Sequence, residues 1–382
     1  MLMLLELLIA TALAALASAA LCPVVIAAGL WDNPDSARKN HRAPTPTAGG
    51  LAAASGFALS LAILSFWPHA QWGETLTQGA PRQVALAVAA AFAALVLGLF
   101  DDLQNLGPRF KFGLMTVLSF FVAIFVARAQ VFSIGAGMVL DTGIVFGVLG
   151  SALWVFTMAN AVNFIDGANG LSMGSMAVGL VGLAMIAWVH DAPHAMALAL
   201  CGVGGLIGLL GWNFPKGKVF AGDAGALFVG VLAAAAGLIL VQDGGVSPIV
   251  PPLLFFPILA DVLLTLAHRA RKGRPLLEAH RDHLYQVGLR AGLSHARVAV
   301  IYWVVTAHCA VLAFVASYAV RIAPSSLLEP KPGDAPMASV VMGQVAGWLA
   351  ALAPYIALLV LAIVAMRVSD RVRRFADARG LV

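Results

Sequence analysis

The chain has 382 residues, of which 61% are hydrophobic and 11% are charged, and its mean hydropathy is +0.93. So apolar a composition is typical of an integral membrane protein and excludes a soluble enzyme. The net charge of +5 fits basic loops facing anionic lipid, and without a nucleic-acid-binding module it does not indicate nucleic acid as a partner. Cys22, Cys201 and Cys309 fall inside apolar runs, where a thiol is usually a small core residue, so no disulfide framework is expected.

About eleven apolar runs are long enough to cross a bilayer, which takes roughly 20 helical residues. In chain order they are residues 3–28, 49–67, 84–100, 112–128, 144–162, 171–190, 194–212, 224–241, 249–267, 298–320 and 340–366. Because the runs are continuous and not short and alternating, the expected fold class is an all-α polytopic membrane protein and not a β-barrel. The first run is too long for a signal-peptide core and lacks a basic start, so we interpret it as the first span.

The basic residues predict the orientation, because Lys and Arg collect in cytoplasmic loops. With the N-terminus outside, all of the 23 Lys and Arg residues lie on the inner side except Arg82, Arg128, Arg321 and Lys331. Eleven spans then place the C-terminus inside, with residues 367–382 as a basic cytoplasmic tail. We find no internal repeat, and we expect residues 1–382 to form a single transmembrane domain.

Four polar clusters follow or precede apolar runs on this inner side, and the first is Asp101-Asp102. Two adjacent like charges favour a neutralising cation nearby, and Lys111 follows on the same short loop, well placed to reach an anionic group. The ordinary alternative is a pair of solvated helix-end acids and a lysine that anchors at the membrane boundary.

The second cluster spaces amide and carboxylate oxygens three residues apart, at Asn160, Asn163, Asp166 and Asn169. A helix end would present such a row on one side, and hard oxygen donors suit Mg²⁺ or Mn²⁺. A capped helix end followed by a turn is the alternative. Because capping rarely needs three amides and an acid, we favour a binding function.

The third cluster, Gly222-Asp223-Ala-Gly225, opens an apolar run. Asp223 is a candidate N-cap residue. Helix N-termini also favour phosphate oxygens, and a metal ion held by Asp223 would strengthen such a site. The two interpretations are compatible.

The fourth cluster, His280-Arg281-Asp282-His283, lies in the most basic loop. The fork of Arg281 suits a phosphate or diphosphate, and the two histidines can donate hydrogen bonds to it. Zinc is disfavoured because the loop has no Cys and no third soft ligand.

Together the motifs resemble those of the polyprenyl-phosphate N-acetylhexosamine-1-phosphate transferases, which start peptidoglycan lipid, teichoic acid and O-antigen synthesis. The likeness covers about residues 31 to 290 and includes an early stretch from Asp32 to Gly50. It implies that Asp223 and Asn163 ligate Mg²⁺ (or Mn²⁺) and that Asp101, with Asp102 beside it, deprotonates the lipid phosphate. The substrate-binding positions that it implies are Lys39, His41, Lys111, Asn160, Asp166, Asn169, His280, Arg281 and His283.

The resemblance implies transfer of a sugar-1-phosphate from a UDP-N-acetylhexosamine to undecaprenyl phosphate, with release of UMP, in a bacterial inner membrane. His280-Arg-Asp-His-Leu-Tyr-Gln is less like the peptidoglycan branch, which has a His-His pair, and more like enzymes that initiate O-antigen or related glycans. The expected donor is therefore UDP-GlcNAc, UDP-QuiNAc or UDP-FucNAc. Asn105, and Leu114 to Thr116, depart from the family pattern, so contacts in that loop are expected to differ.

Several alternatives stay open. Phospho-MurNAc-pentapeptide transfer is the nearest. A membrane transporter would use polar residues near the midplane, where Asp261 is either a satisfied buried carboxylate or a structural link to the site. An intramembrane aspartyl protease is disfavoured because Phe220-Ala-Gly-Asp223 lacks the first Gly of its motif. For the transferase reaction, direct attack by the lipid phosphate and passage through an aspartyl-phosphate intermediate are equally compatible with the sequence. A homodimer also stays open, because packed and lipid-facing surfaces have similar compositions.

Overall fold

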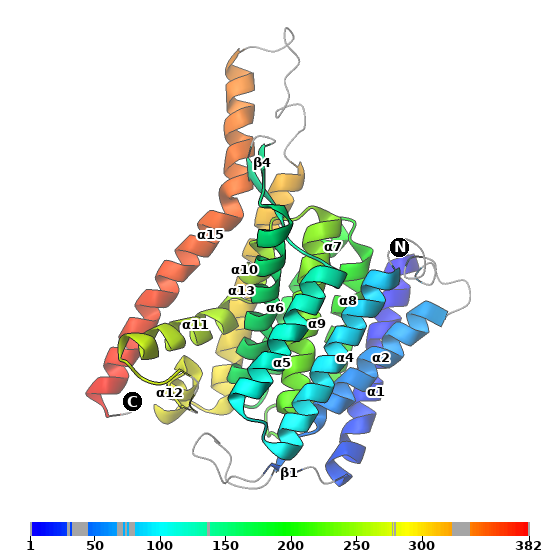
Figure 1. Cartoon of the computed structure of the whole chain (residues 1–382), viewed down its shortest axis with the longest axis vertical. Helices are drawn as coiled ribbons and strands as arrows, with labels where there is room; N and C mark the ends of the chain where they lie inside the picture. The colour runs from blue at the N-terminus through cyan, green and yellow to red at the C-terminus, as the bar shows by residue number, and fades with distance from the viewer. Residues whose placement is uncertain are drawn as a thin grey trace.

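The computed structural model describes residues 2–28, 31–32, 45–66, 72, 75, 81–135, 138–276, 278, 280–322 and 337–380. Lys39 and His41 lie outside these residues. The described part is almost entirely helical (Figure 1). Its long helices are α1 (Leu2–Ala27), α2 (Gly49–Phe66), α4 (Pro81–Gln104), α5 (Pro108–Phe121), α6 (Gly143–Ile165), α7 (Leu171–Val189), α8 (Pro193–Asn213), α9 (Gly222–Gly244), α13 (His295–Ile322) and α15 (Met337–Ala378).

Within the described residues, 10 helical segments are long and apolar enough to cross a membrane, so a polytopic helical membrane protein is confirmed. Each corresponds to one of the apolar runs, with α5 continuing into the short π-helix η1 (Val122–Val126). The eleventh predicted run, 249–267, does not form one long helix. It is divided into α10 (Val250–Leu254) and α11 (Phe256–Arg271). Pro257 has no N–H to continue the hydrogen-bond ladder of α10, so the chain turns at Phe255. Figure 1 shows α11 lying across the direction of its neighbours.

Helix α9 forms the centre of the bundle. It packs against α2, α4, α6 and α8, and every residue from Ala224 to Val241 is buried. A helix that is apolar on every side can face either lipid or other helices, and α9 is enclosed by other helices. The position of Asp223, in the first turn of α9, is therefore fixed by several helices at once.

Two short antiparallel strand pairs lie between helices in the described part of the chain. At one end of the bundle, β1 (Trp31–Asp32) pairs with β2 (Thr45–Pro46), antiparallel. The amide of Phe220 donates to the carbonyl of Pro46 over 2.7 Å, so the entrance to α2 is tied to the entrance to α9. At the opposite end, β3 (Val131–Gly135) pairs with β4 (Met138–Asp141), also antiparallel, with an irregularity between Ser133 and Gly135.

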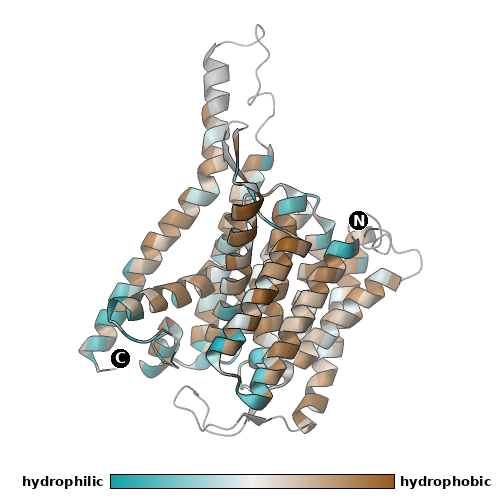
Figure 2. Cartoon of the chain, in the orientation of Figure 1, coloured by the Kyte–Doolittle hydropathy of each residue, from teal (hydrophilic) through white to brown (hydrophobic). Residues whose placement is uncertain are grey.

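Hydrophilic residues gather at the end of the bundle that holds β1, as Figure 2 shows for the loop between α4 and α5 and for the end of α11. We call this the polar end. The short helix α12 (Leu284–Arg290) and the C-terminal end of α15 also lie there. All four predicted clusters lie at this end.

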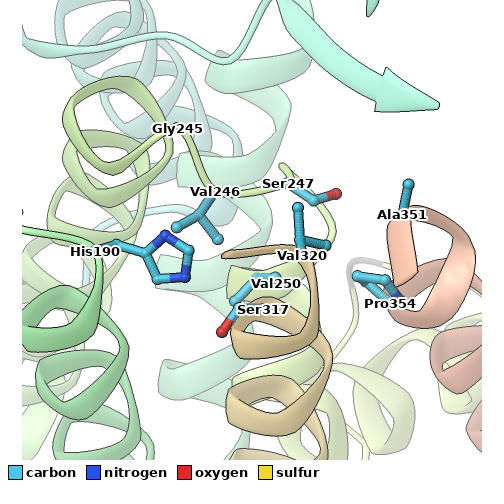
Figure 3. Close-up of a pocket in the computed structure, with 9 residues that line it drawn as sticks. All are labelled: His190, Gly245, Val246, Ser247, Val250, Ser317, Val320, Ala351 and Pro354. Carbon is cyan, nitrogen blue, oxygen red and sulfur yellow. The ribbon is translucent and has the colours of Figure 1, made fainter. Parts of the chain in front are cut away.

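Two cavities lie at the other end of the bundle and are separate from these clusters. One, of about 20 Å³, is lined by His190, Ser247 and Ser317 among others (Figure 3), and it has room for about one water molecule. The other, of about 360 Å³, is mainly apolar and is lined by residues including Phe146 and Trp154. Neither cavity contains a residue from the four motifs.

Candidate functional site at the polar end

Lys111 brings three of the four predicted clusters together. Its Nζ lies 2.5 Å from Oδ2 of Asp101 and 3.3 Å from Oδ1 of Asn163, and it forms an ion pair with Asp223. Asp101 comes from the last turn of α4, Lys111 from the first turn of α5, Asn163 from the last turn of α6 and Asp223 from the first turn of α9. Four helix ends therefore supply one charged centre, which we call the Lys111 cluster.

The Lys111 cluster is largely shielded from solvent and carries more negative than positive charge. The exposed fraction of the Lys111 side chain is 10% and that of Asp101 is 12%. Removing a partner from such a group leaves a poorly hydrated charge, which is costly. Since Asp101 and Asp223 carry two negative charges against one ammonium, the cluster favours a further cation.

Asp102 has a different role from Asp101. Its two carboxylate oxygens accept the backbone N–H groups of Asp223 and Ala224, each over 3.1 Å. These are unpaired amides in the first turn of α9, so Asp102 caps that helix from α4. The sequence interpretation of Asp223 as its own helix's N-cap is wrong, because the Asp223 side chain contacts Lys111 while Asp102 provides the cap.

Two glycines allow α4 to approach the start of α9. A Cβ on Gly98 would lie 2.4 Å from the backbone carbonyl of Asp223. Gly222 has a φ of +70°, and a Cβ there would lie 2.7 Å from Oδ2 of Asp102. Both positions therefore require Gly, the first for close packing and the second also for its left-handed backbone.

The amide-rich segment from Asn160 to Asn169 does not direct all its side chains to one centre. Asn163 contacts Lys111, whereas Asn160 donates to the carbonyl of Phe156 within its own helix over 2.8 Å. Asp166 accepts a hydrogen bond from Ser172, and Asn169 donates to the carbonyl of Pro215 over 3.0 Å. Of these four residues, Asn163 is the one whose hydrogen bond reaches the Lys111 cluster.

Asp166, the acid of this segment, lies directly after the end of α6. Burial raises its pKa to about 7, and the Asp223 charge adds to this effect, while the Ser172 hydroxyl opposes it. Its proton occupancy therefore changes near neutral pH.

The turn after Asp166 depends on Asn213, which the sequence analysis did not single out. Asn213 accepts from the amide of Gly170 over 2.5 Å and donates to the carbonyl of Val219 over 2.8 Å. It thereby connects the segments that precede α7 and α9. Its signal in the sequence was a single amide at the end of the apolar run 194–212.

The fourth cluster packs against the second. The rings of His283 and Phe164 have centroids 6.2 Å apart, and the Tyr285 hydroxyl donates to the Phe164 carbonyl over 3.4 Å. The rings of His280 and His283 lie 4.9 Å apart, and Arg281 lies between them in the chain. The two histidines and Arg281 are therefore held beside the end of α6 that carries Asn163.

Asp282, in the same loop, is not a free ligand. It forms an ion pair with Arg269 and lies 3.5 Å from Arg274. Burial alone would raise the pKa of Asp282, but the Arg269 guanidinium holds it below its usual value. Asp282 therefore anchors the loop as a carboxylate. Arg269 was another residue that the motifs did not identify.

The residues of the Lys111 cluster fit a magnesium ion in part. Among the described residues, no group of three or more His, Cys, Asp and Glu side chains is arranged to hold a metal. Mg²⁺, however, usually takes only one or two carboxylates from the protein and completes its shell with water and substrate phosphates. Asp223 and Asn163 both direct an oxygen to the Lys111 ammonium, so two hard donors already converge where a cation is stabilised.

The fold and the site together define a polytopic membrane protein with an anionic, lysine-bridged site at one end. Residues 84–241 match glycosyl transferase family 4. The decaprenyl-phosphate N-acetylglucosaminephosphotransferase of Mycobacterium leprae is 31% identical over 296 residues, covering 70% of this chain and 72% of that protein. The chain therefore belongs to glycosyl transferase family 4, which confirms the family that the motifs predicted.

Two further relatives represent both branches of the resemblance. The probable undecaprenyl-phosphate N-acetylglucosaminyl 1-phosphate transferase of Bacillus subtilis is 27% identical over 285 residues, which cover 73% of this chain and 75% of that protein. The phospho-N-acetylmuramoyl-pentapeptide-transferase of Desulforudis audaxviator is 29% identical over 297 residues, which cover 72% of this chain and 85% of that protein.

Proposed function

We propose that this protein transfers an N-acetylhexosamine-1-phosphate from a UDP-sugar to undecaprenyl phosphate and releases UMP. The observation that carries the proposal is the meeting of Asp101, Lys111, Asn163 and Asp223 at one end of the bundle. The names of the relatives support a polyprenyl phosphate as acceptor. The positive charge of the loops at this end supports a cytoplasmic site, where UDP-sugars are available.

The proposed reaction exchanges one phosphorus–oxygen bond for another. An oxygen of the lipid phosphate attacks the sugar-bearing phosphorus of the UDP-sugar and forms the new diphosphate bond. The bond from that phosphorus to the bridging oxygen breaks, and its electron pair leaves with UMP. Such a transfer mainly requires neutralisation of charge and alignment of the attacking and leaving oxygens.

The residues of the Lys111 cluster have distinct roles in this scheme. Asp101 accepts the proton of a singly ionised lipid phosphate, and Lys111 holds the diphosphate oxygens. Asp223 and Asn163 would hold Mg²⁺, which supplies charge neutralisation to the diphosphate when bound. Asp102 keeps Asp223 in place through the cap on α9.

The loop around Arg281 provides the second set of anion-binding groups. His280, Arg281 and His283 offer hydrogen-bond donors beside the end of α6, and the fork of Arg281 suits a diphosphate. Two anionic substrates must approach one another in this reaction. Lys111, which contacts Asn163, and Arg281, in the loop that packs against Phe164, would supply cationic groups near this helix end.

The donor sugar is proposed to be UDP-GlcNAc or an aminodeoxy relative such as UDP-QuiNAc or UDP-FucNAc, and the pathway to be O-antigen or related envelope-glycan synthesis. Two of the relatives described above are named for N-acetylglucosamine. Phospho-MurNAc-pentapeptide transfer is the second candidate, and the Desulforudis audaxviator relative favours it. The absence of an adjacent His-His pair in 280–283 disfavours it.

The test is UMP release by the purified protein with undecaprenyl phosphate, Mg²⁺ and a panel of UDP-N-acetylhexosamines, including UDP-MurNAc-pentapeptide. Asp223→Ala is expected to abolish release. Asp141→Ala removes an exposed carboxylate at the opposite end of the bundle and is the matched control, expected to retain release. Folded wild-type protein that releases no UMP from any donor would contradict the proposal, and the fastest donor would identify the substrate.

A further inference from the structure

Asp261 is a buried carboxylate whose oxygens are fully engaged. It lies on α11 with 1% of its surface exposed. Oδ1 accepts from the amide of Leu284 over 2.8 Å and from the Thr265 hydroxyl over 3.2 Å. Oδ2 accepts from the amide of Tyr285 over 3.2 Å and from the Tyr302 hydroxyl over 2.5 Å. A carboxylate bound in this way is a structural element and not an ion-transport site.

The two backbone bonds make Asp261 the cap of the next helix. Leu284 and Tyr285 are the first residues of α12, and their amides have no partner within that helix. Nδ1 of His283 also lies 3.4 Å from Oδ1 of Asp261. Asp261 thus fixes the backbone directly after His283 and lies beside the ring of His283.

Arg373, on the C-terminal helix α15, holds the same loop from the other side. It is 4% exposed. Its guanidinium donates to the hydroxyl of Thr265 over 2.9 Å and to the carbonyl of Asp282 over 3.2 Å. Since Thr265 accepts from Arg373, its own hydrogen is directed to Asp261. Arg373, Thr265 and Asp261 form a continuous hydrogen-bonded chain from α15 to α12.

We propose that Asp261 and Arg373 are positioning residues that hold the loop 280–283 against the end of α6. The loop reaches that position through the Tyr285 hydroxyl, which donates to Phe164, and through the ring contact of His283 with Phe164. Anion-binding groups are effective when they are ordered before the substrate arrives. Both positioning residues lie outside residues 84–241, which match the family.

The consequence for substrate binding rests on the proposed function, but the positioning itself does not. If Arg373 only anchored α15, its removal would loosen that helix and leave the amides of Leu284 and Tyr285, which Asp261 binds, protected. If Asp261 and Arg373 position the loop, protection is lost first at the start of α12. Hydrogen exchange therefore separates the two roles without any enzymatic assay.

The first experiment is hydrogen–deuterium exchange of the full chain in lipid nanodiscs, followed by peptides that cover residues 280–290. Asp261→Asn is expected to speed exchange at the start of α12 by about tenfold, because amides lose a charged acceptor. Arg373→Gln is expected to act in the same direction. Arg374→Gln is the matched control, because Arg374 is exposed and bonds within its own helix to the carbonyl of Asp370. Unchanged exchange in both variants would overturn the proposal.

Tyr302→Phe provides a milder version of the same test. It removes one hydroxyl donor from Asp261 and leaves the ring in place, so it serves if Asp261→Asn does not fold. Faster exchange confined to 280–290 supports positioning. Faster exchange along α15 with an unchanged 280–290 segment contradicts it.

The second experiment measures UMP release. Arg373→Gln is expected to raise KM for the UDP-sugar about tenfold with a smaller change in kcat, because the loop binds the substrate anion in the ground state. Arg373→Lys, which keeps the charge but not the fork, is expected to recover part of the loss. An unchanged KM in an active enzyme would contradict the role in substrate binding. If wild-type protein releases no UMP, the proposed function fails while the exchange result still decides the positioning role.

Discussion

Lys111 determines the arrangement of the site at the level of single residues. It connects Asp101, which is 10 positions away in the chain, with Asp223, which is 112 positions away. Its ammonium is the group that allows two carboxylates to lie together in a shielded place. A substrate diphosphate or a metal ion must therefore enter a centre whose charges are already partly balanced.

Lys111→Met is expected to destabilise the protein by about 3–5 kcal/mol, because Asp101 and Asp223 lose their shared partner. UMP release is expected to fall by about 100-fold or more, as when a charge-stabilising donor is removed. Thermal unfolding in detergent and the UMP assay measure the two effects. Arg109→Met is the control, since Arg109 is exposed two positions earlier in the chain. Equal effects of the two substitutions would show that Lys111 has no special role.

Asp102→Ala is expected to cost about 1 kcal/mol of stability through loss of the α9 cap. It is also expected to reduce UMP release, because Asp223 lies in the uncapped turn. Asp102→Ser, which retains one capping oxygen, should recover part of both losses. Thermal unfolding and the UMP assay again supply the measurements. An Asp102→Ala protein with wild-type stability would exclude the capping role.

Asp166 is expected to make stability depend on pH. Its pKa rises from the ordinary 3.8 to about 7 in the folded protein, so between these values the folded state holds a proton that the unfolded state has lost. The contribution of Asp166 to stability therefore decreases as pH rises from about 4 to about 7. Asp166→Asn should remove this part of the dependence in unfolding measurements without Mg²⁺. An identical pH profile for the variant would contradict the shift.

The positions of the four clusters were predictable because polar residues at the ends of apolar runs are costly unless they are used. Their partners were not. Asp102 was expected to act beside Asp101, yet it binds the backbone of a helix more than 100 positions later, over 3.1 Å. Asn213 and Arg373 carry no motif, and their roles arise from contacts made only after folding. The Asn160 side chain forms its hydrogen bond within its own helix, and this orientation also depends on packing.

At the level of helices, the composition predicted that a helix exists more accurately than it predicted the residues at which the helix begins and ends. The run 84–100 became α4, which extends to Gln104, so Asp101 lies inside the last turn and not after it. The run 249–267 has the apolar length of a span, but its prolines divide it at Phe255. That division lets α11 cross its neighbours and bring Asp261 to the loop 280–283.

Gly98→Val is expected to separate α4 from α9 because a Cβ at Gly98 would overlap the carbonyl of Asp223. Overpacking of this kind costs about 1–3 kcal/mol, and it should move Asp223 away from Lys111 and reduce UMP release. Gly113→Ala is the control, since nothing lies within 4 Å of a Cβ there. Normal stability and release in Gly98→Val would show that the helices tolerate a wider spacing.

At the level of the whole molecule, the arrangement of the bundle agrees with the grouping that the basic residues predicted. The residues of the four clusters, which come from α4, α5, α6, α9 and two loops, lie at one end of the bundle (Figure 1), as they must if the chain crosses the membrane in alternating directions. The contacts of Lys111 and His283 establish that grouping. Which side of the membrane this end faces is a prediction of the positive-inside rule.

Labelling of single cysteines tests the orientation. Arg109→Cys places a thiol at the polar end and Asp141→Cys places one at the opposite end, and both positions are exposed. The background should be low because Cys22, Cys201 and Cys309 are buried. A membrane-impermeant maleimide is expected to label Asp141→Cys in intact spheroplasts and Arg109→Cys only in inverted vesicles. The reverse pattern would place the site outside, away from UDP-sugars, and the proposed donor would then have to be abandoned even though the arrangement of the Lys111 cluster would be unchanged.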